Sequence, residues 1–216
     1  MFCTVNHIRL YYEVTGSGSP LIMVHGNSED HSIFCKAVPE LAKTHTVYTV
    51  DSRCHGQSDD PEEISYDLMA DDLMGFIRAL RLDKPVFYGF SDGGILGLLI
   101  AMRTPGLLGK LIVSGANLTP EGLQEADRAF VRKIAARGNK LFQMMEREPN
   151  ISPADLAQIT VPTVVLAGEK DMILPEHTRL IADSIPGAVL EILPGEDHGS
   201  YIIESEKLAP VLQRYL

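Results

Sequence analysis

The sequence contains few cysteines, no cluster of basic residues and no apolar run long enough to cross a bilayer. Its three cysteines, Cys3, Cys35 and Cys54, lie far apart and form no C-x-x-C pair, so they indicate neither a disulfide framework nor a zinc site. The formal net charge is −10 and Lys and Arg are scattered, which makes nucleic acid and anionic membrane surfaces poor partners. The longest apolar run, residues 93–102, is roughly half the length of a transmembrane helix.

The N-terminal residues also lack the basic region and apolar stretch of a signal peptide, so we expect a cytoplasmic protein. The chain has 216 residues, of which 45% are hydrophobic and 22% charged, which is typical of an ordinary soluble globular protein. This length predicts one domain, or one domain with a modest insertion.

Short apolar runs alternate along the chain with segments of helical period, such as residues 66–80, whose apolar side chains recur every three or four positions. Continuous apolar runs of this length are typical of parallel strands that are buried on both faces. The alternation predicts an α/β fold with a doubly wound, mostly parallel sheet of about eight strands and an antiparallel N-terminal hairpin. The runs are residues 21–24, 47–50, 86–88, 111–113 and 164–167, and residues 189–193 form a nearly continuous one.

One stretch, residues 117–158, interrupts this alternation with a charged helical segment at 121–140 and a shorter helical piece at 141–147. We expect a core formed by residues 1–116 and 159–216, and a small helical cap formed by the insertion. An insertion on the side where strand ends open would lie over the active site as a lid, with Phe142 and Met145 as substrate-binding candidates. The alternative is a pair of surface helices without a role in binding.

The pentapeptide Gly89-Phe90-Ser91-Asp92-Gly93 is a G-x-S-x-G motif between an apolar run typical of a strand and one typical of a buried helix. A serine at such a turn adopts a strained backbone, and its hydroxyl is exposed to a substrate. The helix N-terminus behind it directs free backbone N–H groups toward an anion. Ser91 is therefore the candidate nucleophile.

Acyl transfer also needs two donors aimed at the developing oxyanion. His25-Gly26-Asn27 directly follows the apolar run at 21–24, and the backbone N–H groups of Asn27 and Asp92 are the candidates for this oxyanion hole. For His25 the alternative to a role in chemistry is a structural one, in which the ring orients the loop.

A nucleophilic serine needs a base, and the base needs an acid that holds its tautomer. His198 follows the last predicted strand between glycines, and Asp171 follows the strand before it. Six other histidines compete with His198, Glu169 is the nearest rival of Asp171, and Asp171 itself could be an ordinary turn residue. Asp197 is a poor partner for His198, because adjacent side chains diverge.

Taken in order, these segments resemble the α/β-hydrolase fold superfamily over nearly the whole chain except the insertion. The family's chain order of nucleophile, acid and base matches Ser91, Asp171 and His198. The loop at 51–58 resembles the family pattern D-x-R-G-H-G-x-S, with Cys54 in place of the usual glycine. The segments are His-Gly-Asn at 25–27, DSRCHGQS at 51–58, GFSDGG at 89–94, GEKD at 168–171 and DHG at 197–199.

The resemblance implies a serine hydrolase that cleaves carboxylic esters of small molecules through an acyl-enzyme intermediate, without a metal or cofactor. Ser-Asp-Gly-Gly also resembles the nucleophile turn of the biphenyl-hydrolase-like (valacyclovir-hydrolase) group, which includes hydrolases of amino-acid esters. By that resemblance Asp92 would give some preference for cationic or α-amino esters. The alternative is that Asp92 points away and satisfies nearby backbone groups.

Other reactions stay open, because the same fold hosts many of them. Thioester or carbon–carbon bond hydrolysis would use the same three residues, and perhydrolysis is a further alternative. The main alternative outside catalysis is a ligand receptor on the same fold. The oligomeric state is not predicted by any feature of the sequence.

Overall fold

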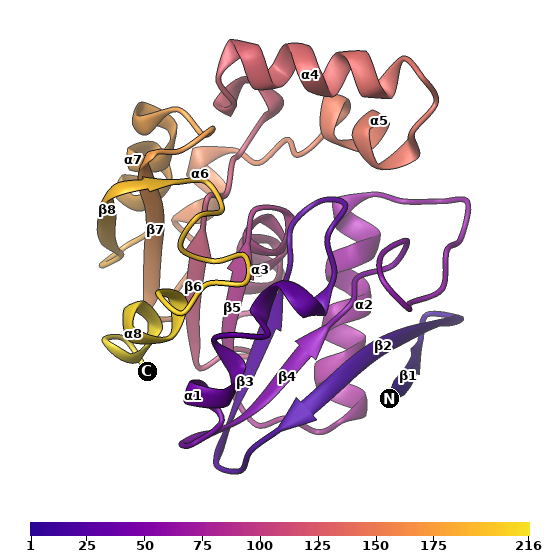
Figure 1. The fold of residues 1–216 in the computed structure, drawn as a ribbon, viewed down its shortest axis with the longest axis vertical. Helices are drawn as coiled ribbons and strands as arrows, with labels where there is room; N and C mark the ends of the chain where they lie inside the picture. The colour runs from indigo at the N-terminus through magenta and orange to yellow at the C-terminus, as the bar shows by residue number, and fades with distance from the viewer.

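The computed structural model describes residues 1–216 and contains one eight-stranded sheet with the order β1-β2-β4-β3-β5-β6-β7-β8 (Figure 1). β1 pairs antiparallel with β2, and β2 pairs antiparallel with β4, whereas all the other neighbours are parallel. The predicted mostly parallel sheet with an antiparallel N-terminal hairpin is therefore confirmed. The strands are β1 (Phe2–Val5), β2 (Ile8–Thr15), β3 (Ser19–Val24), β4 (His45–Val50), β5 (Val86–Phe90), β6 (Lys110–Ser114), β7 (Thr163–Lys170) and β8 (Val189–Asp197).

Helices cover both faces of the sheet, which explains why the central strands are continuous apolar runs. Along β3, Ile22 and Val24 belong to the cluster that α2, α3, α6 and α7 cover, whereas Leu21 and Met23 belong to the cluster under η1, α1 and α8. No helix is both long and apolar enough to span a bilayer. The helices that cover the two faces of the sheet are η1 (His31–Phe34), α1 (Val38–Leu41), α2 (Tyr66–Ala79), α3 (Asp92–Arg103), α6 (Pro153–Leu156), α7 (Pro175–Ser184) and α8 (Leu208–Gln213).

Helix α2 illustrates how the sequence sets these elements. Ser65 caps it, because its hydroxyl accepts a hydrogen bond of 3.1 Å from the Leu68 N–H, and Asp67 follows in the first turn. One face of the helix is buried, including Phe76 and Ile77. The predicted stripe at 66–80 thus corresponds to an observed helix.

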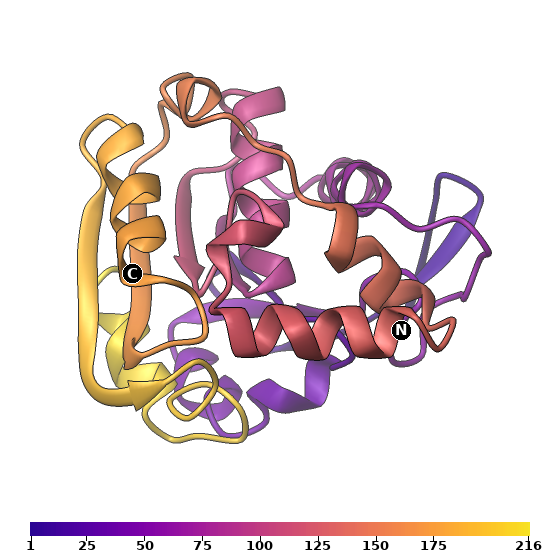
Figure 2. The same ribbon diagram turned by 90° about the horizontal axis from the view of Figure 1, so that it is seen from above.

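The insertion between β6 and β7 contains α4 (Glu125–Ala135) and α5 (Lys140–Arg147), which lie above the carboxyl ends of the strands (Figure 1). Figure 2 shows the same pair from above, with α4 crossing the middle of the molecule. The expected single helical segment at 121–140 is shorter in the structure. A 3-10 turn, η2 (Pro120–Gly122), precedes it, and Gly138 at φ +88° separates it from α5.

The strand order reverses at β3, because the chain passes from β3 to β4 on one side and then to β5 on the other. In open α/β sheets, ligands bind in the crevice outside the carboxyl ends of the strands at such a reversal. The loop that begins with His25 leaves β3 at this point, and the turn at Ser91 leaves β5 beside it. The topology therefore brings the two predicted parts of the oxyanion hole together.

Candidate active site

The turn between β5 and α3 is as tight as the pentapeptide predicts. Ser91 lies at φ +52° and ψ −113°, a region that L-residues rarely adopt. A Cβ at position 89 would lie 2.1 Å from the Gly93 carbonyl oxygen, and a Cβ at position 93 would lie 2.3 Å from that of Val24. Only glycine fits at either position, so the two flanking glycines allow the strained serine to project from the sheet.

The structure brings Ser91, His198 and Asp171 into one chain of hydrogen bonds. The Ser91 Oγ lies 3.1 Å from His198 Nε2, and His198 Nδ1 lies 2.6 Å from Asp171 Oδ1. An ionised carboxylate can only accept, so Nδ1–H donates to Asp171, and Nε2 is left to accept the hydroxyl proton of Ser91. These distances are within the reach needed for proton transfer.

Asp171 is held by the backbone that follows β7. Its Oδ1 also accepts from the Ile173 N–H at 2.9 Å, and its Oδ2 accepts from the Gly168 N–H at 3.3 Å. The side chain is almost fully buried. The rival Glu169 instead accepts a hydrogen bond from the Gly195 N–H, outside this chain of contacts.

The backbone N–H groups of Asn27 and Asp92 make no hydrogen bond within the chain. Asp92 is the first residue of α3, so its N–H has no partner in the helix. His25 fixes the neighbouring loop: its Nε2 accepts from the Ser52 N–H at 3.1 Å, and its Nδ1 lies 2.7 Å from the Gly26 carbonyl oxygen. Burial lowers the pKa of His25 to about 4, so the ring is neutral and structural.

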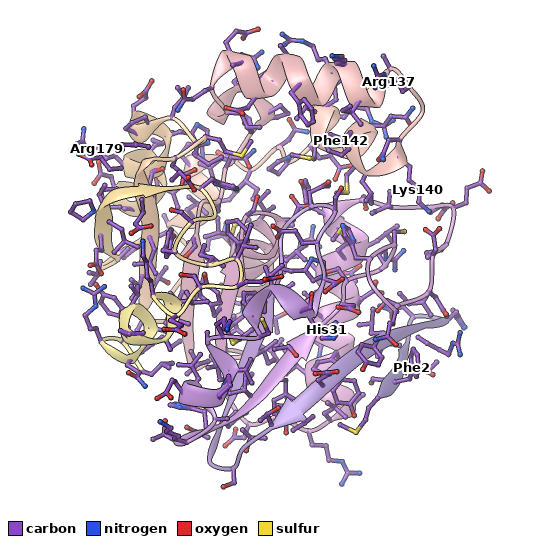
Figure 3. All side chains as sticks on the ribbon, viewed as in Figure 1. Phe2, His31, Arg137, Lys140, Phe142 and Arg179 are labelled. Carbon is purple, nitrogen blue, oxygen red and sulfur yellow. The ribbon has the colours of Figure 1, made fainter.

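A cavity of about 190 Å³ opens beside Ser91 and His198. Phe142 and Met145 of α5, the two substrate-binding candidates of the insertion, are among the residues that line it. In Figure 3, Phe142 lies below α4, between the insertion and the core. The Phe142 ring also packs edge-to-face with Phe130 of α4, with 5.9 Å between the ring centroids.

The structure does not bring the Asp92 carboxylate into this cavity. Its Oδ1 accepts from the Tyr66 hydroxyl at 2.7 Å, its Oδ2 accepts from the Asn27 side-chain amide at 3.2 Å, and only 2% of the residue is exposed. Burial raises the pKa of this carboxyl. Contact with Asn27 links the two residues predicted to supply the oxyanion hole, so the geometry gives the side chain a bridging position and does not support direct contact with a substrate cation.

Sequence reasoning missed three features of the site. Glu29 and Phe130 line the cavity beside Ser91. Gly115, directly after β6, lies at φ +61°, and a Cβ there would lie 2.6 Å from His198 Cε1, so a side chain would displace the imidazole. Glu29 could have been found from its place two residues after Asn27, but Phe130 depends on how α4 crosses the sheet.

The model of the alpha/beta hydrolase fold matches residues 19–150, which is more than half of the chain. The chain belongs to this family. Within the alpha/beta hydrolase fold family it is similar to the AB hydrolase superfamily protein YisY of Bacillus subtilis, at 28% identity over 98% of this chain and 97% of that protein. The alignment runs over 259 positions, so YisY has residues that this shorter chain lacks.

Two further comparisons cover nearly all of the chain. The serine hydrolase BPHL of Homo sapiens is 23% identical over 98% of this chain and 84% of its own length. The structure of a thermophilic esterase from Thermogutta terrifontis superposes with a TM-score of 0.80 at 25% identity, over 96% of this chain and 93% of that chain. These alpha/beta hydrolase relatives indicate a hydrolase.

Proposed function

We propose that this protein is a serine hydrolase that cleaves carboxylic esters of small molecules through an acyl-enzyme intermediate. The single observation that carries the proposal is the continuous line of contacts from the Ser91 hydroxyl through the His198 imidazole to the Asp171 carboxylate. A serine is a weak nucleophile until an adjacent base takes its proton. Here His198 is that base, because its own proton is on Nδ1, facing Asp171, and its Nε2 is free to accept the proton of Ser91.

The reaction then proceeds in two stages. His198 Nε2 takes the Ser91 proton as Oγ attacks the carbonyl carbon, and the backbone N–H groups of Asn27 and Asp92 stabilise the oxyanion. His198 returns the proton to the leaving alcohol as the acyl-enzyme forms. It next takes a proton from water, which attacks the acyl carbon, and returning that proton to Ser91 Oγ releases the acid.

The insertion at 117–158 supports a further part of the proposal, in which its helices α4 and α5 form a small lid, whereas α6 packs on the core. Phe142 and Met145 contribute apolar surface to the cavity beside Ser91. Such surface would hold the apolar part of an ester and exclude water from the acyl-enzyme. The relatives named serine hydrolase and esterase support the choice of an ester as the substrate class.

The test is hydrolysis of p-nitrophenyl acetate together with covalent labelling by a fluorophosphonate. We expect labelling of the natural chain, no labelling of Ser91→Ala, and a fall in kcat/KM by at least roughly a thousandfold in that variant. Ser17→Ala, at an exposed serine in the turn before β3, is the matched control and should keep full activity. A folded natural chain that neither labels nor hydrolyses any ester of a broad panel would contradict the proposal.

A further inference from the structure

A second carboxyl group, that of Glu29, lies in the cavity beside Ser91. Its Oε2 accepts a hydrogen bond of 2.8 Å from the Gly26 N–H, in the loop that follows β3. A Cβ built on Gly26 would lie 2.8 Å from this oxygen and 3.0 Å from the Ser91 Cβ, so the carboxyl group and the nucleophile flank the same point. The ester mechanism proposed above uses no group at this position.

Apart from Asn27, Ser91 and His198, the rest of the cavity wall is apolar and aromatic. Phe90, Phe130 and Phe142 line it together with Met145 and Met172, and no Lys or Arg side chain is present among the lining residues. His198 is the only lining side chain that can carry a positive charge, and it must be neutral to act as the base, so the Glu29 carboxylate has no permanent cation beside it in the cavity. A negative group beside aromatic faces is the chemistry that binds ammonium groups, since the faces attract cations through their quadrupole.

We propose that Glu29 and the phenylalanine rings form a cation subsite, and that the substrates are esters with an ammonium group close to the scissile carbonyl. This inference rests on the proposed ester hydrolysis and adds the substrate class. It assigns cation recognition to Glu29, whose carboxyl group lines the cavity, whereas the Asp92 carboxyl is already held by Tyr66 and Asn27.

The protonation of Glu29 gives the subsite a pH dependence. Burial raises its pKa to about 7, and the charged groups that influence it are His198, Asp92 and Asp30. The carboxylate forms as the pH rises through this pKa, so preference for a fixed cation should rise over the same range. Activity also requires a neutral His198, but this requirement affects the charged and the neutral ester equally. It therefore cancels in the ratio of their kcat/KM values.

The experiment compares esters of equal shape that differ in a fixed charge. One pair carries the charge on the alcohol (choline acetate and 3,3-dimethylbutyl acetate), and the other on the acyl group (phenyl esters of trimethylglycine and 3,3-dimethylbutanoic acid). The readout is the ratio of kcat/KM for charged over neutral ester. We expect a preference for the charged member of at least one pair that grows between pH 5.5 and 8. Glu29→Gln should reduce it by roughly tenfold or more and make it independent of pH.

Asp30→Asn is the matched control, because it removes the same charge from the next residue, whose side chain caps η1 instead of lining the cavity. At pH 8, where Glu29 is ionised in both proteins, its ratio should remain that of the natural chain. The inference is overturned if neither pair shows a charge preference, if Asp30→Asn or Asp92→Asn abolishes the preference as fully as Glu29→Gln does, or if Glu29→Gln slows both members of each pair equally. Hydrolysis of the neutral esters that is lost in Ser91→Ala would show that the ester-hydrolase proposal itself still holds.

Discussion

At the scale of single residues, the site is defined by which atoms remain free to react. Ser91 is held in a strained conformation by a turn that excludes any side chain at positions 89 and 93. Asp171 is fixed by two backbone N–H groups, so its Oδ1 meets His198 Nδ1 in one orientation. The reactivity proposed for Ser91 therefore depends on the tautomer that Asp171 imposes on His198.

This dependence predicts the effect of Asp171→Asn. An Asn side chain keeps the shape but can donate to Nδ1, which would place the imidazole proton on Nε2 and remove the base from Ser91. We expect kcat for p-nitrophenyl acetate to fall on the order of 10³- to 10⁴-fold with little change in KM. The control is the thermal unfolding midpoint, which should stay near that of the natural chain. Activity retained in Asp171→Asn would argue for another partner, such as Glu169.

At the scale of elements, the loops after the strands carry the site and the helices beneath them supply rigidity. In the loop after β4, Cys54 replaces the glycine of the family pattern. It lies at φ +63°, a conformation that favours glycine. This explains why the resembling family pattern has glycine there. The buried pair between Arg53 and Asp72, with N···O distances of 2.6 and 2.8 Å, anchors the same loop to α2.

The insertion between β6 and β7 is the element whose role is most open to test. Because Phe142 lines the cavity, Phe142→Ala should raise KM for esters with a bulky apolar acyl group several-fold and leave acetate esters much less affected. Arg137→Ala, in the exposed turn between α4 and α5, is the control and should change neither (Figure 3). Equal kinetics of Phe142→Ala on both esters would favour a surface helix pair without a role in binding.

At the scale of the whole molecule, buried ionisable groups connect pH to stability. His25 is fully buried and neutral, with its pKa lowered to about 4 from an ordinary value of 6.5. The unfolded chain therefore binds more protons than the folded chain between these two values. The free energy of unfolding must then fall as the pH is lowered through this window.

We therefore expect the free energy of unfolding to fall on acidification in a way that depends on His25. Between pH 7 and pH 4, His25 should lower the free energy of unfolding by up to roughly 3 kcal/mol. His25→Asn, whose amide can donate to the Gly26 carbonyl, should be less stable at neutral pH but show a smaller loss on acidification. Urea unfolding of both proteins at pH 7 and pH 5 measures the difference. Equal losses on acidification would contradict this contribution of His25.

Much of this fold could be predicted from the sequence, because the continuous apolar runs allow few alternatives to strands buried on both faces. The positions of Ser91, Asp171 and His198 at strand ends follow from the same pattern. The cavity wall could not be predicted: Phe130 lies among charged residues of α4, and its place depends on where the insertion crosses the sheet. The direction of the Asp92 side chain likewise depends on Tyr66, which is distant in sequence.

The order of the strands also has a consequence for folding. Asn27 and Ser91 follow neighbouring strands in the first half of the chain, whereas Asp171 and His198 lie at the ends of β7 and β8. A chain in which β8 has not yet paired with β7 can hold the proposed nucleophile and oxyanion donors but lacks the proposed base, His198. The proposed activity should therefore return during refolding only when β8 pairs with β7. The recovery of ester hydrolysis over time would then measure the rate of that step.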